Sequence, residues 1–206
     1  MLLAALTGGI ASGKSMVAGV FEELGCYIHH ADAVAHELME PHRPAWKAVV
    51  AHFGPDILGP DNTINREKLG AIAFSKKKER RFLNELLHPL VMEQKKDIIV
   101  RLRKEGHYKI FVSEAALTVE AGYADFFDKI MVVYCPKEVQ IVRLMERDRI
   151  SRKEALKKLQ SQMPAEEKLK YADYVVDTSG TIESTVEQAE KVFRSLMSDY
   201  ENKSLV

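Results

Sequence analysis

The sequence has little of what secreted, fibrous or membrane-spanning proteins need. Its 206 residues include two cysteines, Cys26 and Cys135, which form no C-x-x-C pair. This argues against a disulfide framework or a zinc site and suits a reducing cytosol. Seven prolines and eleven glycines are too few for a disordered or collagen-like chain. No stretch approaches the roughly 18 apolar residues of a membrane span, and the apolar N-terminal residues follow no basic flank. We therefore expect a cytoplasmic protein with no membrane partner.

Neither sign of charge prevails. Thirty Lys and Arg balance thirty Asp and Glu, whereas proteins that hold nucleic acid usually carry a basic excess, so we expect no nucleic-acid partner. The basic run from Lys76 to Arg81 lacks interleaved aromatic residues and is typical of a solvated helix face. The length fits one domain, residues 1–206, with small insertions, and leaves the oligomeric state open.

Short apolar runs alternate with longer amphipathic stretches. Five runs predict strands, at residues 2–6, 26–29, 108–113, 129–135 and 174–177. Short apolar strands separated by helices, the first at 14–24 and the last from Ile182 on, predict a five-stranded parallel sheet buried on both faces. The fold class is therefore three-layer α/β.

Two intervals break the alternation. Residues 30–107 carry several turn signals and two predicted helices but no strand. A plain crossover is much shorter, so this interval predicts an inserted helical subdomain. Residues 143–170 are basic and helical in pattern and predict a lid.

The strongest motif is a phosphate loop between the first strand and the first helix. It matches G-x-x-x-x-G-K-[ST] with Gly8, Gly9, Ile10, Ala11, Ser12, Gly13, Lys14 and Ser15. The glycines let backbone N–H groups surround an anion, and the helix start adds its positive end. The lysine serves the β- and γ-phosphates, and the hydroxyl suits Mg²⁺. A glycine turn that merely joins strand to helix would not need all eight residues, so we expect nucleoside triphosphate binding.

Other patterns separate the classes of triphosphate-binding protein. A regulatory GTPase needs Asn-Lys-x-Asp, and the only Asn-Lys is Asn202-Lys203, near the end of the sequence. A mechanical ATPase needs an apolar strand that ends in an acidic pair, which Ile110 to Glu114 resembles weakly. The insertion and the basic lid favour a small-molecule kinase. A kinase of nucleosides or nucleoside monophosphates, and a nucleotide-dependent switch or scaffold, remain alternatives.

Asp32 follows the second strand, at the sheet edge where α/β proteins bind ligands. It is suited to accept a proton from an acceptor hydroxyl or to join a Mg²⁺ shell. It is equally suited to cap a helix from Ala33 to Met39. A metal cluster with His29, His30 and His36 is a third reading, without a recognised ligand spacing.

Several short motifs, ordered over nearly the whole chain, resemble the dephospho-coenzyme A kinase family. The resemblance implies a P-loop kinase that uses ATP and Mg²⁺ to phosphorylate the ribose 3′-hydroxyl of dephospho-CoA, giving CoA and ADP, the last step of CoA synthesis. It also implies that residues 30–107 bind this acceptor. The motifs are the phosphate loop, Ala31-Asp32, Asn65 to Leu69, Leu87 to Leu90, Arg147-Asp148 with Ser161-Gln162, and Ala172 to Val176.

By the same resemblance, Asp32 engages the 3′-hydroxyl, with Lys14 and Arg147 as further catalytic residues. Arg66 grips an acceptor phosphate, and His88 with Pro89 positions the acceptor. The residues alone also allow purely structural roles. Arg66 could be an exposed arginine at a helix start, and His88-Pro89 could mark a helix junction.

The resemblance also implies a lid built from arginines and a place for the adenine. Arg147 matches the lid position best, Gln162 is a weaker match, and the loop at residues 177–180 lies near adenine. A solvated basic helix is the alternative to the lid. The other lid candidates are Arg143, Arg149 and Arg152.

Some positions depart from the family pattern. His30 stands where an Asp is frequent, Ala11 stands at a frequent Gly, and Lys158 stands at a frequent Arg. Ser15 is the expected Mg²⁺ ligand, with Asp32 and Glu114 as further ligands through water. Glu114 is alternatively a helix cap or an assistant to Asp32.

Overall fold

The computed structural model describes residues 1–205. The chain divides into two compact units. Unit 1 comprises Met1–His30 and the chain from Ile99 onward, and unit 2 comprises Ala31–Ile98. Each unit has its own apolar core and is described by itself.

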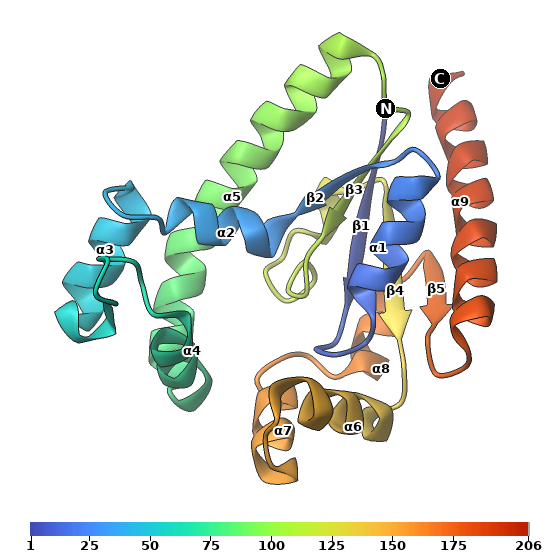
Figure 1. Ribbon diagram of the computed structural model, residues 1–206. Helices are drawn as coiled ribbons and strands as arrows, with labels where there is room; N and C mark the ends of the chain where they lie inside the picture. Colours follow the sequence, from blue (N-terminus) through green and yellow to red (C-terminus); the bar gives the residue numbers. More distant parts are fainter. Residues whose placement is uncertain (206) are drawn as a thin grey trace. The chain divides into compact units, whose positions relative to one another are not determined.

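Unit 1 is built on a five-stranded parallel sheet with strand order β2-β3-β1-β4-β5 (Figure 1). The central strand β1 is buried along its whole length between β3 and β4. The predicted five-stranded parallel sheet is confirmed, with strand ends that differ from prediction by up to two residues. The strands are β1 (Leu2–Gly8), β2 (Tyr27–His30), β3 (Ile110–Glu114), β4 (Lys129–Tyr134) and β5 (Tyr174–Asp177).

Helices complete the three-layer arrangement of unit 1. α1 (Lys14–Glu23) and α9 (Ile182–Ser204) run side by side against the sheet (Figure 1). They bury Val17, Phe21 and Leu196 against the apolar strands, and burial of this kind is the main favourable term in folding. The stretch predicted as a lid forms the end of α6 (Lys137–Asp148), then α7 (Arg152–Leu159) and α8 (Ala165–Lys168).

Unit 2 is helical. The prediction of two helices between residues 30 and 107 is wrong, because the structure has four: α2 (Ala31–Leu38), α3 (Pro44–Phe53), α4 (Arg66–Ser75) and α5 (Lys77–Glu105), which continues into unit 1. Pro44 begins α3, a position that suits proline, and Pro89 lies inside α5 without ending it.

The core of unit 2 gathers apolar side chains from α3, α4 and α5. Val49, Leu69 and Leu83 are buried there, and Trp46 and Phe53 pack against them. This agrees with the separation of seven residues between Trp46 and Phe53, which places both on one face of a helix.

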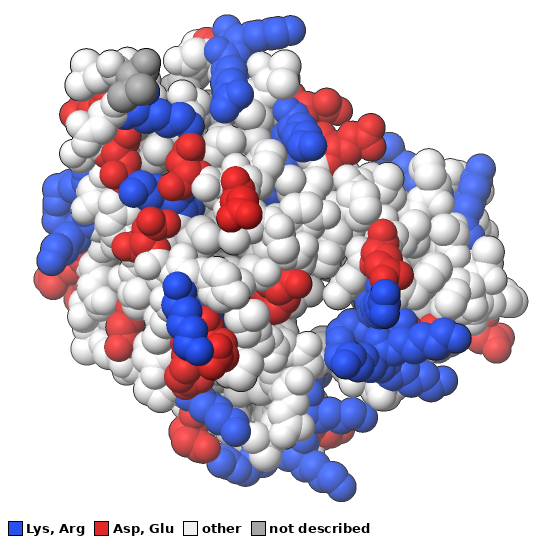
Figure 2. Space-filling model, turned by 180° about the vertical axis from the view of Figure 1, so that it is seen from behind, with Lys and Arg blue, Asp and Glu red and all other residues white. Residues whose placement is uncertain are grey.

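The surface shows the balance of charge that the composition gives. On the face drawn in Figure 2, acidic and basic side chains alternate, with one gathered group of Lys and Arg. Lys76, Lys77 and Lys78 are exposed, in agreement with a solvated basic face. Cys26 and Cys135 are free and buried. Within residues 1–205, no helix combines the length and apolar character that a membrane crossing requires.

Candidate functional site

The phosphate loop lies between the end of β1 at Gly8 and the start of α1 at Lys14. A Cβ at Gly8 would collide with the carbonyl oxygen of Val133 on β4, so only glycine fits there. Gly13 has a φ of 88° and stands at the N-cap of α1 without a side chain to cap it. The N–H groups of the first turn are therefore directed at the space before the helix, which is the geometry of an anion site.

Two side chains hold the loop in shape. The Nζ of Lys14 donates to the carbonyl oxygens of Gly8 and Gly9 at 3.3 and 3.1 Å, so the lysine lies over the loop. The Ile10 N–H donates to Oε1 of Gln162 at 3.0 Å. Gln162, the weaker match by sequence, thus ties the turn after α7 to the phosphate loop.

Oxygen ligands suited to Mg²⁺ meet beside the loop. The Ser15 hydroxyl donates to Oε1 of Glu114 at 3.2 Å, and His30 Nδ1 lies 2.6 Å from Oε2 of the same carboxylate. The sheet register brings them together, because His30 and Glu114 are partners on β2 and β3. A hydroxyl beside a carboxylate is a donor set that Mg²⁺ accepts. No helix begins after Glu114, so its reading as a helix cap is wrong.

The reading of His29, His30, Asp32 and His36 as a metal cluster has no support. Across residues 1–205, no three His, Cys, Asp or Glu side chains converge as ligands for a metal ion.

Arg143 contacts the loop after β5. Its guanidinium donates to the hydroxyl and the carbonyl oxygen of Thr178 at 3.1 and 2.6 Å. The Thr178 hydroxyl in turn donates to the carbonyl oxygen of Ser12 at 2.8 Å. The two residues line a cavity of about 150 Å³ with Gly13 and Met16. Arg143 is therefore part of a wall beside the phosphate loop, and its role as a lid arginine stays a prediction.

Asp148 organises the cations of the predicted lid. It accepts from Nε of Arg147 and from Nζ of Lys158, each at 2.7 Å. The hydrogen bond from Arg147 is the main cause that lowers the pKa of Asp148 to about 2, and the Lys158 ammonium adds to it. The Arg147 side chain is 58% exposed. Arg152 is paired instead with Glu138 at 2.7 Å on the protein surface.

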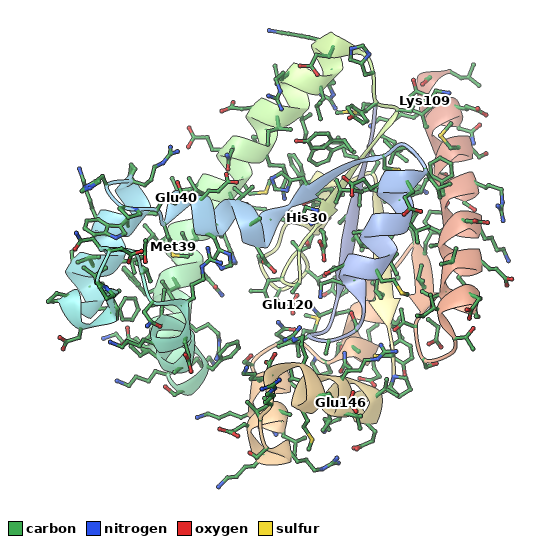
Figure 3. The ribbon with its side chains drawn as sticks, viewed as in Figure 1. His30, Met39, Glu40, Lys109, Glu120 and Glu146 are labelled. Atoms are coloured by element: carbon green, nitrogen blue, oxygen red, sulfur yellow. The ribbon has the colours of Figure 1, made fainter. Side chains whose placement is uncertain are left out.

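A buried ion pair fixes the chain just after α7. The Lys168 side chain has no exposure and lies 2.7 Å from Oε1 of Glu120, in the loop after β3 (Figure 3). The same carboxylate accepts from the Met163 N–H at 3.1 Å, and Lys168 also donates to the carbonyl oxygen of Ala116. Burial lowers the pKa of Lys168, and the Glu120 charge opposes that shift. Sequence reasoning missed this pair, because no local pattern marks a buried lysine.

Asp32 is the second residue of α2, in unit 2, and its side chain is exposed. The helix begins at Ala31, directly after β2, so the reading of Asp32 as an N-cap is wrong. His36 follows one turn later. Its pKa is lowered by burial and by the Arg66 charge, and the Asp32 charge acts in the opposite direction, so both charges act on this imidazole.

The predicted acceptor residues also belong to unit 2. Arg66 is the first residue of α4, capped by Asn65, whose side chain accepts from the Lys68 N–H at 2.9 Å. His88 and Pro89 lie inside α5, so their reading as a helix junction is wrong. Burial lowers the pKa of the His88 imidazole.

The sheet order and the phosphate loop define a P-loop kinase. Solved kinases of other specificity share this fold, for example the shikimate kinase of Acinetobacter baumannii, with a TM-score of 0.55 at 15% identity and coverage of 97% of this chain and 94% of that one. The family model for dephospho-CoA kinase matches residues 2–184, and the chain belongs to that family.

Individual relatives agree with this assignment. The chain is 42% identical to a dephospho-CoA kinase of Halalkalibacterium halodurans, over 91% of this chain and 92% of the relative. It is 45% identical to that of Carboxydothermus hydrogenoformans, over 89% and 88% of the two chains. The solved dephospho-CoA kinase from Campylobacter jejuni superposes with a TM-score of 0.67 at 29% identity, covering 94% of this chain and 96% of that one.

Proposed function

We propose that the protein transfers the γ-phosphoryl group of ATP to the ribose 3′-hydroxyl of dephospho-CoA, giving CoA and ADP. The observation that carries this proposal is the phosphate loop, with Lys14 and Ser15 beside Glu114, in a chain that belongs to the dephospho-CoA kinase family. We also propose that the enzyme works in the cytoplasm, which its free, buried cysteines support.

Unit 1 binds the donor. The N–H groups at the start of α1 and the ammonium of Lys14 hold the β- and γ-phosphates. Ser15 and Glu114 would hold Mg²⁺, which supplies positive charge to the phosphate oxygens when bound. The adenine lies in the cavity beside Thr178 and Arg143, at the loop after β5.

Unit 2 supplies the acceptor side, with Arg66, His88 and Pro89 among its binding residues. Asp32 accepts the proton of the 3′-hydroxyl, or orients it, as the oxygen attacks the γ-phosphorus. The leaving ADP carries the charge of the broken bond, and no phosphoenzyme forms. An exposed carboxylate at the start of α2 suits this role, since it is open to a hydroxyl from solution.

Arg147 acts from the lid on the transferring phosphoryl group. Its guanidinium spreads positive charge over two of the three equatorial oxygens, and closure excludes water that would hydrolyse ATP. Asp148 holds Arg147 and Lys158 together, so the two cations are presented as a group.

The test measures ADP release from Mg²⁺-ATP with and without dephospho-CoA, with the product identified by mass. We expect stimulation by dephospho-CoA and not by nucleosides or nucleoside monophosphates. Asp32→Asn should lower kcat about a hundredfold while ATP still binds, because general base catalysis contributes that much. The control is Glu37→Gln, which removes an exposed carboxylate from the same helix and should leave kcat unchanged. Turnover near wild type in a folded Asp32→Asn protein would contradict the role of Asp32.

A further inference from the structure

His30 belongs to a row of three polar side chains beside the phosphate loop. It is the last residue of the edge strand β2 (Figure 3), and Glu114 is the last residue of the neighbouring strand β3. Ser15 is the second residue of α1. All three lie in unit 1. The proposed function uses Ser15 and Glu114 but leaves His30 without a task.

Each oxygen of the Glu114 carboxylate has its own partner. Oε1 accepts from the Ser15 hydroxyl at 3.2 Å, and Oε2 lies 2.6 Å from Nδ1 of His30. An ionised carboxylate only accepts hydrogen bonds, so the hydrogen lies on Nδ1 and the imidazole donates it. The Glu114 side chain is 13% exposed, and among residues 1–205 no other side chain donates to its Oε2. His30 therefore fixes the orientation of this carboxylate.

The orientation of Glu114 in turn sets that of the Ser15 hydroxyl. A hydroxyl has one hydrogen and two lone pairs, and the hydrogen of Ser15 is directed at Oε1 of Glu114. The lone pairs of the Ser15 oxygen are therefore directed away from the carboxylate and are available to a cation. Groups outside a coordination shell commonly fix metal ligands through such hydrogen bonds. The order of control runs from imidazole to carboxylate to hydroxyl.

We propose that His30 is a positioning residue of the Mg²⁺ site, which acts through Glu114 and touches neither the metal ion nor the nucleotide. The inference rests on the proposed function, which places Mg²⁺ at Ser15 and Glu114. The sheet register supports a hydrogen-bond donor at position 30, because this position pairs directly with Glu114. An aspartate there would face Glu114 as a like charge on the adjacent strand, whereas the imidazole complements it.

The first experiment measures how strongly Mg²⁺ tightens nucleotide binding. Calorimetry gives the dissociation constant of adenylyl imidodiphosphate, an ATP analogue that is not hydrolysed, in EDTA and in excess Mg²⁺. We expect Mg²⁺ to tighten binding to wild type, and we expect this tightening to shrink about tenfold in His30→Ala while the affinity in EDTA stays unchanged. The control is His107→Ala, which removes an exposed imidazole of unit 1 before β3 and should bind like wild type. Circular dichroism checks that both variants fold.

Two amide variants test whether the donor at Nδ1 is what matters. The amide nitrogen of asparagine is as many bonds from Cα as Nδ1 of histidine, whereas that of glutamine matches Nε2. His30→Asn should therefore retain most of the tightening by Mg²⁺, and His30→Gln should lose it as His30→Ala does. A role in packing alone would not separate the two amides, so an equal loss in both variants would overturn the inference.

A double-mutant cycle tests whether His30 acts through Glu114. Glu114→Ala removes the carboxylate that links the imidazole to Ser15. In this background His30→Ala should cause no further loss of tightening by Mg²⁺, because the two effects share one path. A further loss would show that the imidazole contacts the metal ion or the nucleotide directly, and would overturn the positioning role.

The two proposals fail separately, because these binding measurements need no acceptor. Absence of ADP release with dephospho-CoA overturns the function. The role of His30 is overturned if Mg²⁺ tightens binding equally in wild type and His30→Ala, or if it does not tighten binding to wild type. Weaker binding of His30→Ala in EDTA also overturns it, since the imidazole would then act on the nucleotide without the metal ion.

Discussion

Ala11 is the phosphate-loop residue whose backbone suits its side chain least. Its φ of 58° lies in the left-handed region, where a Cβ costs about 1–2 kcal/mol. Ala11→Gly should therefore raise the free energy of unfolding by about 0.5–1 kcal/mol, after the added freedom of the unfolded chain is subtracted. Urea unfolding measures the change.

A matched control for this prediction lies on α4. Ala71 is exposed and helical, so Ala71→Gly should lower the free energy of unfolding by about 1 kcal/mol. Two changes of the same kind should thus have opposite signs, and destabilisation by both would contradict the strain at Ala11.

Single residues could be predicted from the sequence where the motif itself is local. Every phosphate-loop position follows from a contiguous match, so the anion site at the start of α1 could be recognised without a structure. The pairing of His30 with Glu114 could not, because it depends on the register of β2 against β3. The hydrogen bond from Arg143 to Thr178 was missed because it joins residues 35 positions apart.

At the scale of elements, one carboxylate fixes Met163 and Lys168, which lie within the segment predicted as a lid. Glu120→Gln would leave the Lys168 ammonium buried beside a neutral amide, so we expect a loss of about 3 kcal/mol in the free energy of unfolding. The double variant Glu120→Gln with Lys168→Met removes both charges and should recover part of the loss. Urea unfolding of the wild type, Glu120→Gln, Lys168→Met and the double variant gives the coupling energy, and a double variant no more stable than Glu120→Gln would contradict the ion pair.

Asp148, at the end of α6, makes the stability of the protein depend on pH. Its pKa is lowered from an ordinary 3.8 to about 2, so the stabilisation is present above about pH 4 and is lost as the pH falls toward 2. Asp148→Asn should lower the free energy of unfolding by about 1 kcal/mol at pH 7, with a difference from wild type that shrinks below pH 4.

The control for this prediction is Glu146→Gln. Glu146 is an exposed carboxylate of the same helix (Figure 3). Its removal should change the free energy of unfolding little, both at pH 7 and below pH 4. A difference between wild type and Asp148→Asn that stays constant down to pH 3 would contradict the proposed linkage.

At the scale of the whole molecule, the two units have separate cores. Val49 is fully buried in the core of unit 2. Val49→Ala should cost about 2 kcal/mol, and hydrogen exchange should show that loss in the amides of α3 and α4. The amides of β1 and β4 should keep their protection, and ATP binding should stay unchanged. Equal loss of protection in both units would show that they unfold together.

The predictability of the fold differs between the units for a physical reason. A fully apolar run such as Leu2 to Leu6 is enough to predict a buried parallel strand, so the sheet of unit 1 could be predicted. Three helices of unit 2, α2, α3 and α4, are short, and the long helix α5 contains a proline, which in a sequence indicates a helix break. Unit 2 also contains a cavity of about 410 Å³ that Gly70 lines, and no local sequence pattern predicts it.

The buried thiols make the chain ready for site-specific labelling. Burial raises the pKa of Cys26 to about 12 and also raises that of Cys135, so little reactive thiolate forms at neutral pH. A cysteine placed at exposed Gln160, two residues before the Gln162 that binds the phosphate loop, would be the one thiol that a maleimide dye reaches readily. A fluorophore there would report on the segment predicted as a lid, with both native cysteines left in place.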